Sequence, residues 1–491
     1  MDKTTTMAKI NLNNMENTMD MERNFRIEKD SMGELQVPDG AYYGAQTMRA
    51  TLNFPISDLR FPRSFIRALG QIKQAAAKVN SELQLLDPNI SKNIIAAAEE
   101  VIHGDLDNQF VVDIFQTGSG TSTNMNINEV ISNRAIQMLG GVLGSKDPVH
   151  PNDHVNLGQS SNDVIPTAIH IAALYEIKNR LLPSLDLLKN QLEIKAKEFM
   201  PIVKTGRTHL QDATPIRLGQ EFEGYLGQIE RGIQRIHESM AGLSEVALGG
   251  TAVGTGVNTH PEFASKVCSN LSEILKLDIT ETNNHFQAQS SLDAVVETSG
   301  SLKTLAVSLM KIANDLRWLG SGPRAGIGEI DLPEVQPGSS IMPGKVNPVI
   351  PESVCQVASQ VIGNDATITI AGQSGNFEIN VMMPVAAHNI LQSISILSTS
   401  SRNLAAQCVE GIKATERGNK MVHHGLAIVT TLVPHIGYDK SAAIAKEAQA
   451  TSESIKTVAL RRTSFNETEL DKILDPESMT DPRLAPKVSL G

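Results

Sequence analysis

The sequence predicts a mainly all-α protein, and three observations support this fold class. Apolar residues recur at three- and four-residue steps over long stretches, as they do along one face of an α-helix. Few segments alternate apolar and polar residues in the manner of β-strands. Hydrophobic residues make up 41% of the chain but aromatic residues only 4%. The core must therefore be aliphatic and rich in alanine, which suits close packing of helices.

The 491 residues divide into four predicted segments. Residues 1–24 are polar, mixed in charge and without the apolar run of a signal peptide, so we expect a disordered tail. Residues 25–159 form an N-terminal domain that opens with turns and becomes helical from about Arg63. Residues 160–415 form a central bundle of long helices with short breaks, and residues 416–491 form a small C-terminal helical domain.

The central segment carries the clearest helical pattern. From Leu302 to Leu319, leucine and isoleucine recur along one stripe, which predicts a long helix with a buried face. Pro183 interrupts another helical run, because proline lacks the amide hydrogen that a helix interior needs. We expect a kink or break there.

Composition excludes several classes of protein. A net charge of −11 argues against a nucleic-acid binder, and no apolar run is long enough for a membrane span. The three cysteines, Cys268, Cys355 and Cys408, are too few and too widely spaced for a disulfide framework or a zinc site. They fit a reducing compartment, and we expect a cytoplasmic protein. No spacing typical of a metal site is present, so no metal is expected.

Four stretches gather small and polar residues beside the start of a helical pattern. They begin at Gln116, His150, Gly206 and Gly338, and the last reads GSSIMPGKVNP. Any one of these stretches by itself is read as a helix cap or a connecting loop. Helix starts also carry free N–H groups and partial positive charge, so several of them together could bind a small anion such as a carboxylate. The spacing does not establish whether they converge.

The same stretches, in the same order, resemble the blocks of class II fumarase within the fumarase/aspartase superfamily. The matching segments are FQTGSGTSTNMNINEV, HPNDHVN, QSSND, GRTHLQDATP, LGGTAVGTGVNTHPE, SGPRAGIGEI, GSSIMPGKVNP and PHIGYDKSAAIAKEA. The resemblance runs from about Arg26 into the C-terminal segment. The histidine at position 209 and the serine at position 161 resemble the residues of class II fumarase. The related aspartate ammonia-lyases typically have glutamine and threonine at these two positions. The sequence VNPVIPE after Lys345 is closer to the ammonia-lyases.

This resemblance implies a fold and a reaction. The implied subunit is all-α with three domains, and its long central helix bundle forms the core of a homotetramer in which three subunits build each active site. The implied activity is the reversible interconversion of (S)-malate, a small dicarboxylate, with fumarate and water, and no cofactor is implied. Two alternatives remain: an aspartate ammonia-lyase that forms fumarate and ammonia, or an inactive structural protein on a lyase scaffold.

The resemblance also assigns roles to residues. Ser339 is implied as the base that takes the carbon-bound proton, and His209, with Glu352 beside it, as the group that handles the hydroxyl. The implied substrate contacts are Ser119, Gly120, Thr121, Ser160, Ser161, Asn162, Thr208, Ser340, Lys345, Val346 and Asn347. His150, Pro151, Asn152 and Asp153 correspond to a second, peripheral anion site. Asp147 stands near it where fumarases often have arginine, and its charge opposes anion binding there.

Overall fold

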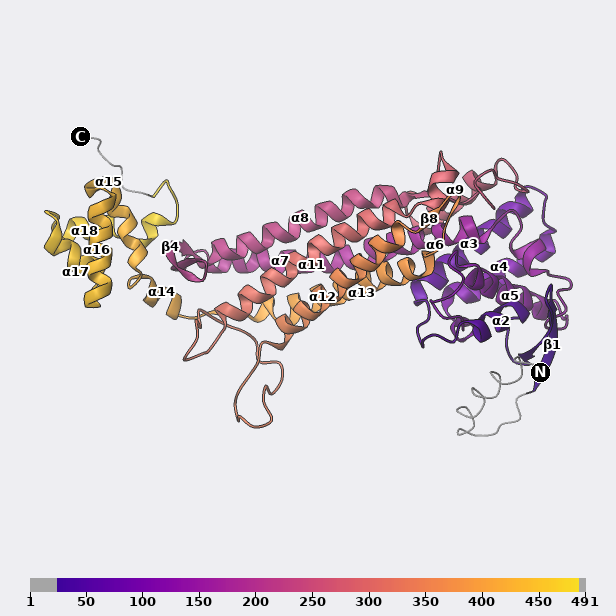
Figure 1. Cartoon of the computed structure of the whole chain (residues 1–491), viewed down its shortest axis with the longest axis horizontal. Helices are drawn as coiled ribbons and strands as arrows, with labels where there is room; N and C mark the ends of the chain where they lie inside the picture. The colour runs from indigo at the N-terminus through magenta and orange to yellow at the C-terminus, as the bar shows by residue number, and fades with distance from the viewer. Residues whose placement is uncertain (1–23, 485–491) are drawn as a thin grey trace, which may run out of the picture. The chain divides into compact units, whose positions relative to one another are not determined.

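The computed structural model describes residues 24–484, and these residues are mainly helical, as predicted (Figure 1). Each sheet among them has only two strands. The predicted disordered tail lies outside the described residues except for Asn24. None of the described helices is long and apolar enough to cross a membrane.

The chain folds into two compact units. Among the described residues, the first combines 24–172, Ser244–Leu292 and Ala371–His388, and the second combines Ala173–Leu243, Asp293–Ile370 and 389–484. Each unit is thus assembled from segments that are far apart in the chain. The division into an N-terminal, a central and a C-terminal domain stays a prediction.

The first unit contains short strands and medium-length helices. Its strands are β1 (Phe25–Asp30), β2 (Gly33–Pro38), β5 (Glu245–Val246), β6 (Thr280–Glu281), β8 (Gly375–Asn376) and β9 (Ile379–Asn380). Its helices are α2 (Ala45–Asn53), α3 (Arg63–Glu82), α4 (Pro88–His103), α5 (Thr121–Met138), most of α6 (Ser161–Glu176), α9 (Phe263–Leu275) and α10 (His285–Ser290). The turn-rich start of the chain is the β1–β2 hairpin, and α3 begins at Arg63 as predicted.

Helix α4 illustrates how the local sequence sets the ends of an element. The carboxylate of Asp87 accepts hydrogen bonds from the N–H groups of Asn89 and Ile90, and Pro88 occupies the first turn, where no N–H is needed. At the other end Gly104 adopts a φ of 98°, a left-handed conformation that glycine adopts without strain.

The second unit contains the long helices. They are α7 (Leu182–Phe199), α8 (Leu218–Ser244), α11 (Asp293–Leu319), α12 (Val349–Gly372) and α13 (Met383–Gln407). The last residues of α8 and α12 and the start of α13, up to His388, belong to the first unit. Shorter helices follow near the C-terminus: α14 (Arg417–Val422), α15 (Val433–Ile436), α16 (Tyr438–Thr451), α17 (Ile455–Arg462) and α18 (Glu467–Ile473). Its strands are β3 (Val203–Thr208), β4 (Gln211–Arg217), β7 (Ile330–Asp331) and β10 (Lys413–Ala414).

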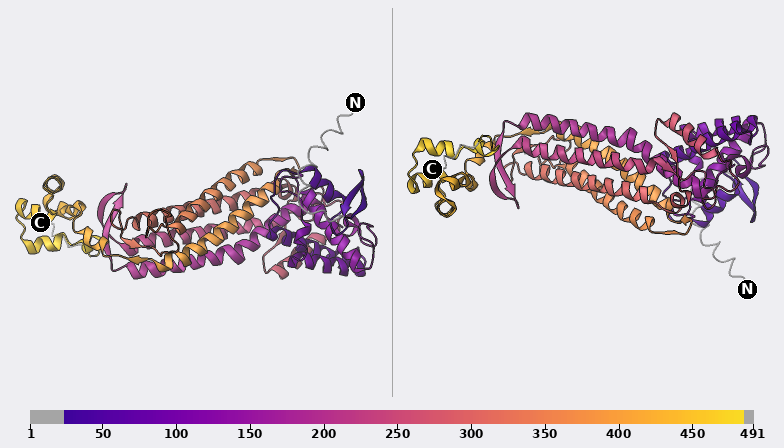
Figure 2. Two further views of the ribbon diagram at one scale, coloured as in Figure 1. Left: turned by 90° about the horizontal axis from the view of Figure 1, so that it is seen from below. Right: turned by 90° about the horizontal axis from the view of Figure 1, so that it is seen from above.

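Helices α7, α8, α11, α12 and α13 lie side by side as a bundle (Figures 1 and 2). The stripe predicted from Leu302 to Leu319 is the buried face of α11, where Leu302, Leu309 and Leu316 are at most 1% exposed. The predicted break near Pro183 is also present. A π-helical turn at Ile177–Leu181 separates α6 from α7, and Pro183 falls in the first turn of α7, where a missing N–H is tolerated.

The short C-terminal helices enclose an apolar cluster of their own. Its buried members include Leu432, Ile444, Val458 and Leu470, which are at most 2% exposed. This part of the chain therefore has a local core, as a small helical domain requires.

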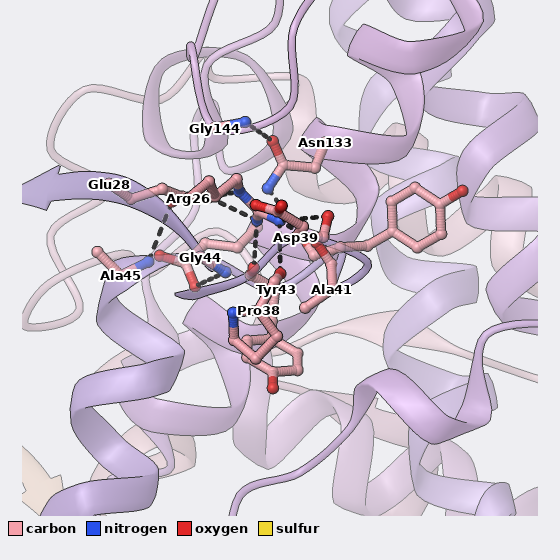
Figure 3. Close-up of polar contacts among 12 residues, drawn as sticks. Arg26, Glu28, Pro38, Asp39, Ala41, Tyr43, Gly44, Ala45, Asn133 and Gly144 are labelled. Carbon is pink, nitrogen blue, oxygen red and sulfur yellow. Dashed lines mark hydrogen bonds and ion pairs between the residues drawn. The ribbon is translucent and has the colours of Figure 1, made fainter. Parts of the chain in front are cut away.

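Buried acidic side chains hold the start of α2 in the first unit. Arg26 donates to Glu28 and to the backbone oxygens of Pro38, Asp39, Ala41 and Tyr43 (Figure 3). Glu28 accepts from the N–H of Ala45 at 3.1 Å. These contacts bind the β1–β2 hairpin to the first residue of α2.

Glu129 of α5 completes this cap. Its carboxylate accepts from the N–H groups of Gly44, Gln46 and Thr47 at 2.8–3.1 Å and from the Thr47 hydroxyl at 2.6 Å. Burial raises the pKa of Glu129, while these hydrogen bonds oppose the rise. The carboxylate supplies acceptors for N–H groups that a helix start leaves unpaired.

Glu129→Gln is expected to lower the free energy of unfolding by about 3 kcal/mol, because an amide provides fewer acceptor sites for four donors, three of which donate in buried hydrogen bonds. Urea or thermal unfolding followed by circular dichroism measures the loss. The control is Glu100→Gln, since Glu100 pairs with Arg134 where both side chains are 26% exposed. If Glu129→Gln lowers the free energy of unfolding by no more than Glu100→Gln does, the capping role of Glu129 is contradicted.

Candidate functional site

The loop from Gly338 to Pro348 is closed at its base by hydrogen bonds. The N–H of Gly338 donates to the oxygen of Lys345 at 2.9 Å, and the Asn347 amide donates to the oxygen of Gly338 at 2.6 Å. A Cβ at position 338 would lie 2.5 Å from the Lys345 oxygen, so only glycine fits there. The tip is open to solvent: Ile341 is 83% exposed and Met342 is 50% exposed.

Ser339 lies at the start of this loop with its hydroxyl aimed at the backbone. Its Oγ accepts from the N–H groups of Ile341 at 3.2 Å and Met342 at 2.9 Å. Two successive N–H groups that point at one oxygen form a concave site for negative charge. The arrangement would therefore favour the ionised form of this serine.

A pocket of about 620 Å³ lies beside the base of the loop. The predicted residues Lys345, Val346, Asn347 and Glu352 contribute to its wall, so the structure brings these four together. The Lys345 ammonium donates to the Asn347 side-chain oxygen at 2.6 Å. Glu352 belongs to the first turn of α12.

Other residues of the pocket wall were not anticipated from the sequence. They include Asn314, Arg317 and Trp318 at the end of α11, and Glu334. Trp318 is 53% exposed, so the one tryptophan of the chain lies at this site rather than in the core. Arg317 and Trp318 lie between the stripe residues Leu316 and Leu319, just before the block SGPRAGIGEI and outside it, so no motif indicated that they line a pocket.

His209 occupies the tip of the β3–β4 hairpin. Thr208 pairs with Gln211, which leaves His209 and Leu210 as a two-residue turn with φ values of 55° and 58°. Two consecutive positive φ angles are typical of the tight turns that match the twist of a hairpin. Both side chains face solvent in the single chain, and Leu210 is 61% exposed.

Buried charges hold the base of this hairpin. Lys204, which is 1% exposed, forms ion pairs of 2.9 Å with Glu221 of α8 and with Glu329. Arg207 adds two hydrogen bonds to Glu329, at 2.7 and 3.1 Å. Burial raises the pKa of Glu221, and Lys204 opposes that rise. Arg207 and Glu329 lie in the stretches GRTHLQDATP and SGPRAGIGEI, and that position was their only signal in the sequence.

The first unit brings together two of the four polar stretches. The Oγ of Ser119 lies 2.9 Å from Oγ1 of Thr121, and that atom lies 2.7 Å from Oγ of Ser161. Thr121 begins α5 and Ser161 begins α6, so two helix starts meet at this hydroxyl row. Gly120 has a φ of 76°, and a Cβ there would lie 2.9 Å from the Ile165 side chain. Such a row of hydroxyl donors at two helix starts suits a carboxylate.

Ser160 and Asn162, two further predicted substrate contacts, flank Ser161 of this hydroxyl row. Ser160 accepts from the N–H of Asn162 at 3.2 Å, and the Asn162 amide donates to the oxygen of Ala252 at 2.7 Å. Ser119, Gly120, Thr121, Ser160, Ser161 and Asn162 thus belong to one cluster of the first unit. Ser339, Ser340, Thr208, His209 and the pocket residues belong to the second unit. Within the described chain, no hydrogen bond or ion pair joins His209 to Glu352.

The predicted peripheral anion residues form a local turn. The Nδ1 atom of His150 accepts from the N–H groups of Asn152 and Asp153, both at 3.2 Å, and so caps the turn that begins at Pro151. Burial lowers the pKa of His150, although Asp153 opposes this. These contacts account for His150 as a cap, and the peripheral anion site stays a prediction. Residues 24–484 contain no group of three side chains placed to hold a metal ion.

Comparison with known proteins gives consistent results. Residues 33–363 match the family described as lyase, and residues 428–481 match the family described as fumarase C C-terminus. Fumarate hydratase, mitochondrial, of Danio rerio is 53% identical over 94% of this chain and 91% of its own length. Fumarate hydratase class II of Nitrosomonas europaea is 51% identical over 93% of this chain and 99% of its own length.

A solved structure agrees with these relatives. The recombinant class II fumarase from Schistosoma mansoni superposes with a TM-score of 0.92 at 40% identity. The match covers 94% of this chain and 100% of that chain.

Proposed function

Because the chain belongs to the class II fumarase family, we propose that it is a fumarate hydratase, a hydro-lyase that interconverts (S)-malate with fumarate and water. In this role it serves the tricarboxylic acid cycle. The observation that carries the proposal is the identity of about half of all positions with fumarate hydratases over more than nine tenths of the chain. The side-chain geometry supports the assignment of roles.

The reaction requires removal of a proton from a carbon next to a carboxylate. Such a proton is very weakly acidic, so the negative charge that spreads onto the carboxylate must be stabilised as the proton leaves. The site therefore needs donors for the carboxylate, a base for the proton, and a separate group that protonates the departing hydroxyl.

Ser339 is the proposed base, and it takes the carbon-bound proton as an alkoxide. A serine hydroxyl is a weak base unless its ionised form is stabilised. The N–H groups of Ile341 and Met342, which donate to its Oγ, provide this stabilisation. The proton then passes from the substrate carbon to the Ser339 oxygen.

His209 is the proposed acid for the hydroxyl, which leaves as water, and it acts as the base in the hydration direction. Its place at the tip of an exposed turn leaves the ring free to meet a substrate. Glu352 orients the ring. Since no hydrogen bond or ion pair joins the two side chains in the described single chain, we propose that they come from different subunits of one active site.

The substrate carboxylates have two sets of proposed donors. Lys345 and Asn347 hold one carboxylate through an ammonium and an amide, with Val346 and Ser340 beside them. The hydroxyl row of Ser119, Thr121 and Ser161, with Gly120, Ser160 and Asn162, holds the other, and Thr208 donates near His209.

We propose that the protein is a homotetramer in which three subunits build each active site. Exposed apolar side chains flank the proposed catalytic residues: Leu210 beside His209, and Ile341 and Met342 after Ser339. Exposed apolar groups beside a site are typical of surfaces that another chain covers. We also propose a cytoplasmic location, which the free cysteines fit. The mitochondrial relatives make the mitochondrion the competing location.

The test is a comparison of two substrates. Purified protein is incubated with malate and separately with aspartate, and fumarate is followed by its ultraviolet absorbance. We expect fumarate from malate only. Fumarate and ammonia from aspartate without turnover of malate would favour the ammonia-lyase, which the sequence VNPVIPE after Lys345 motivates. Inactivity of an intact oligomer on both acids would favour the structural protein.

A further inference from the structure

A buried lysine lies next to the segment that carries the serines of the hydroxyl row. Lys73 of α3 is 0% exposed, and its ammonium donates to the side-chain oxygens of Asn156 at 2.9 Å and Gln159 at 3.0 Å. Burial lowers the pKa of Lys73 to about 7, although Asp163 opposes the shift. No step of the proposed reaction uses this residue.

Asp163, a residue of opposite charge, is the last residue of the same segment. It is also 0% exposed, and one carboxylate oxygen accepts from the N–H of Ser160 at 2.9 Å. The other oxygen accepts from the N–H groups of Gly249 at 3.1 Å and Thr251 at 2.9 Å. Asp163 therefore binds the serine segment to the loop that follows β5.

The hydrogen bonds leave this segment little freedom. The Gln159 amide donates to the oxygens of Val155 and Leu157, and the Asn156 amide donates to the oxygen of Gln159. Gln159 immediately precedes Ser160. The chain from Asn156 to Asp163 is thus held at its start by Lys73 and at its end by the Asp163 carboxylate, and Ser160, Ser161 and Asn162 lie between them.

We propose that Lys73 and Asp163 are positioning residues for substrate-carboxylate binding. They fix the segment between them so that Ser161 meets Thr121 and the hydroxyl row keeps its spacing. The inference rests on the proposed function, since it assigns the row to a dicarboxylate. Stability does not explain such a pair by itself, because replacement of buried opposite charges by neutral groups of similar volume is often neutral or stabilising.

The test uses Lys73→Met, Asp163→Asn and the double variant in the full-length oligomer. Each single change leaves one buried charge uncompensated, so both single variants are expected to melt at lower temperature. Lys73→Met is expected to raise KM for malate and for fumarate by about tenfold while kcat changes less, the pattern of lost binding rather than lost chemistry. The double variant restores charge balance and melting temperature but retains the raised KM, because Asn156 and Gln159 still lack their donor.

Lys78→Met is the matched control, since Lys78 lies on the same helix with its side chain exposed and is expected to leave KM unchanged. Binding of succinate, an unreactive dicarboxylate, is measured by calorimetry beside the kinetics. A wild-type KM in Lys73→Met would overturn the inference, as would a double variant that regains wild-type KM along with its stability. If the wild type binds succinate but does not turn over malate, the proposed function fails, and the succinate affinities of the variants still decide the positioning role.

Discussion

Ser339→Ala is expected to lower kcat for malate by about three orders of magnitude, the scale of a lost general base. KM is expected to change less, because Lys345, Asn347 and the hydroxyl row remain. The fold is expected to persist, since the N–H groups of Ile341 and Met342 lie in an exposed loop where water can replace the serine oxygen. The measurements are steady-state kinetics, light scattering for the oligomer, and a thermal melt.

The control for this change is Ser359→Ala. Ser359 lies on α12 in the same unit, and its hydroxyl donates to the oxygen of Cys355 one helical turn earlier. Its loss is expected to leave turnover unchanged. Activity of Ser339→Ala close to that of the wild type would remove Ser339 from the role of base.

His209→Asn is expected to lower kcat by a factor of about 10² to 10³, because asparagine does not transfer protons as imidazole does. Asparagine is the informative replacement, since it accepts positive φ more readily than most residues. The turn at φ 55° is therefore expected to keep its shape. Assembly and melting temperature are expected to stay unchanged, and steady-state kinetics with malate, light scattering and a thermal melt measure these outcomes.

His237→Asn provides the comparison, because His237 is an exposed histidine of α8 outside the proposed site. It is expected to be as active as the wild type. Loss of assembly in His209→Asn, with normal turnover by the remaining oligomer, would mark His209 as a structural residue of an interface.

Much of the fold could be predicted from the sequence because helices are encoded locally. The apolar stripe of α11, the start of α3 at Arg63 and the break before Pro183 all follow from three- and four-residue periodicity or from the missing N–H of proline. The candidate site could be predicted because its residues lie in contiguous motifs, such as GSSIMPGKVNP.

The sequence by itself thus determined the fold class and many of the helices, and it supplied the candidate residues for the proposed chemistry. The tertiary structure decided which of these side chains contact one another. Thr121 and Ser161 are 40 residues apart in the chain, and they share a hydrogen bond because the first turns of α5 and α6 lie next to each other. The periodicity of apolar residues also does not predict the caps that Glu129 and Glu28 form on α2. Nor does it predict the contact of Lys73 with Asn156. A pattern of apolar residues reports which face of an element is buried, whereas contacts between distant polar side chains depend on how the elements pack.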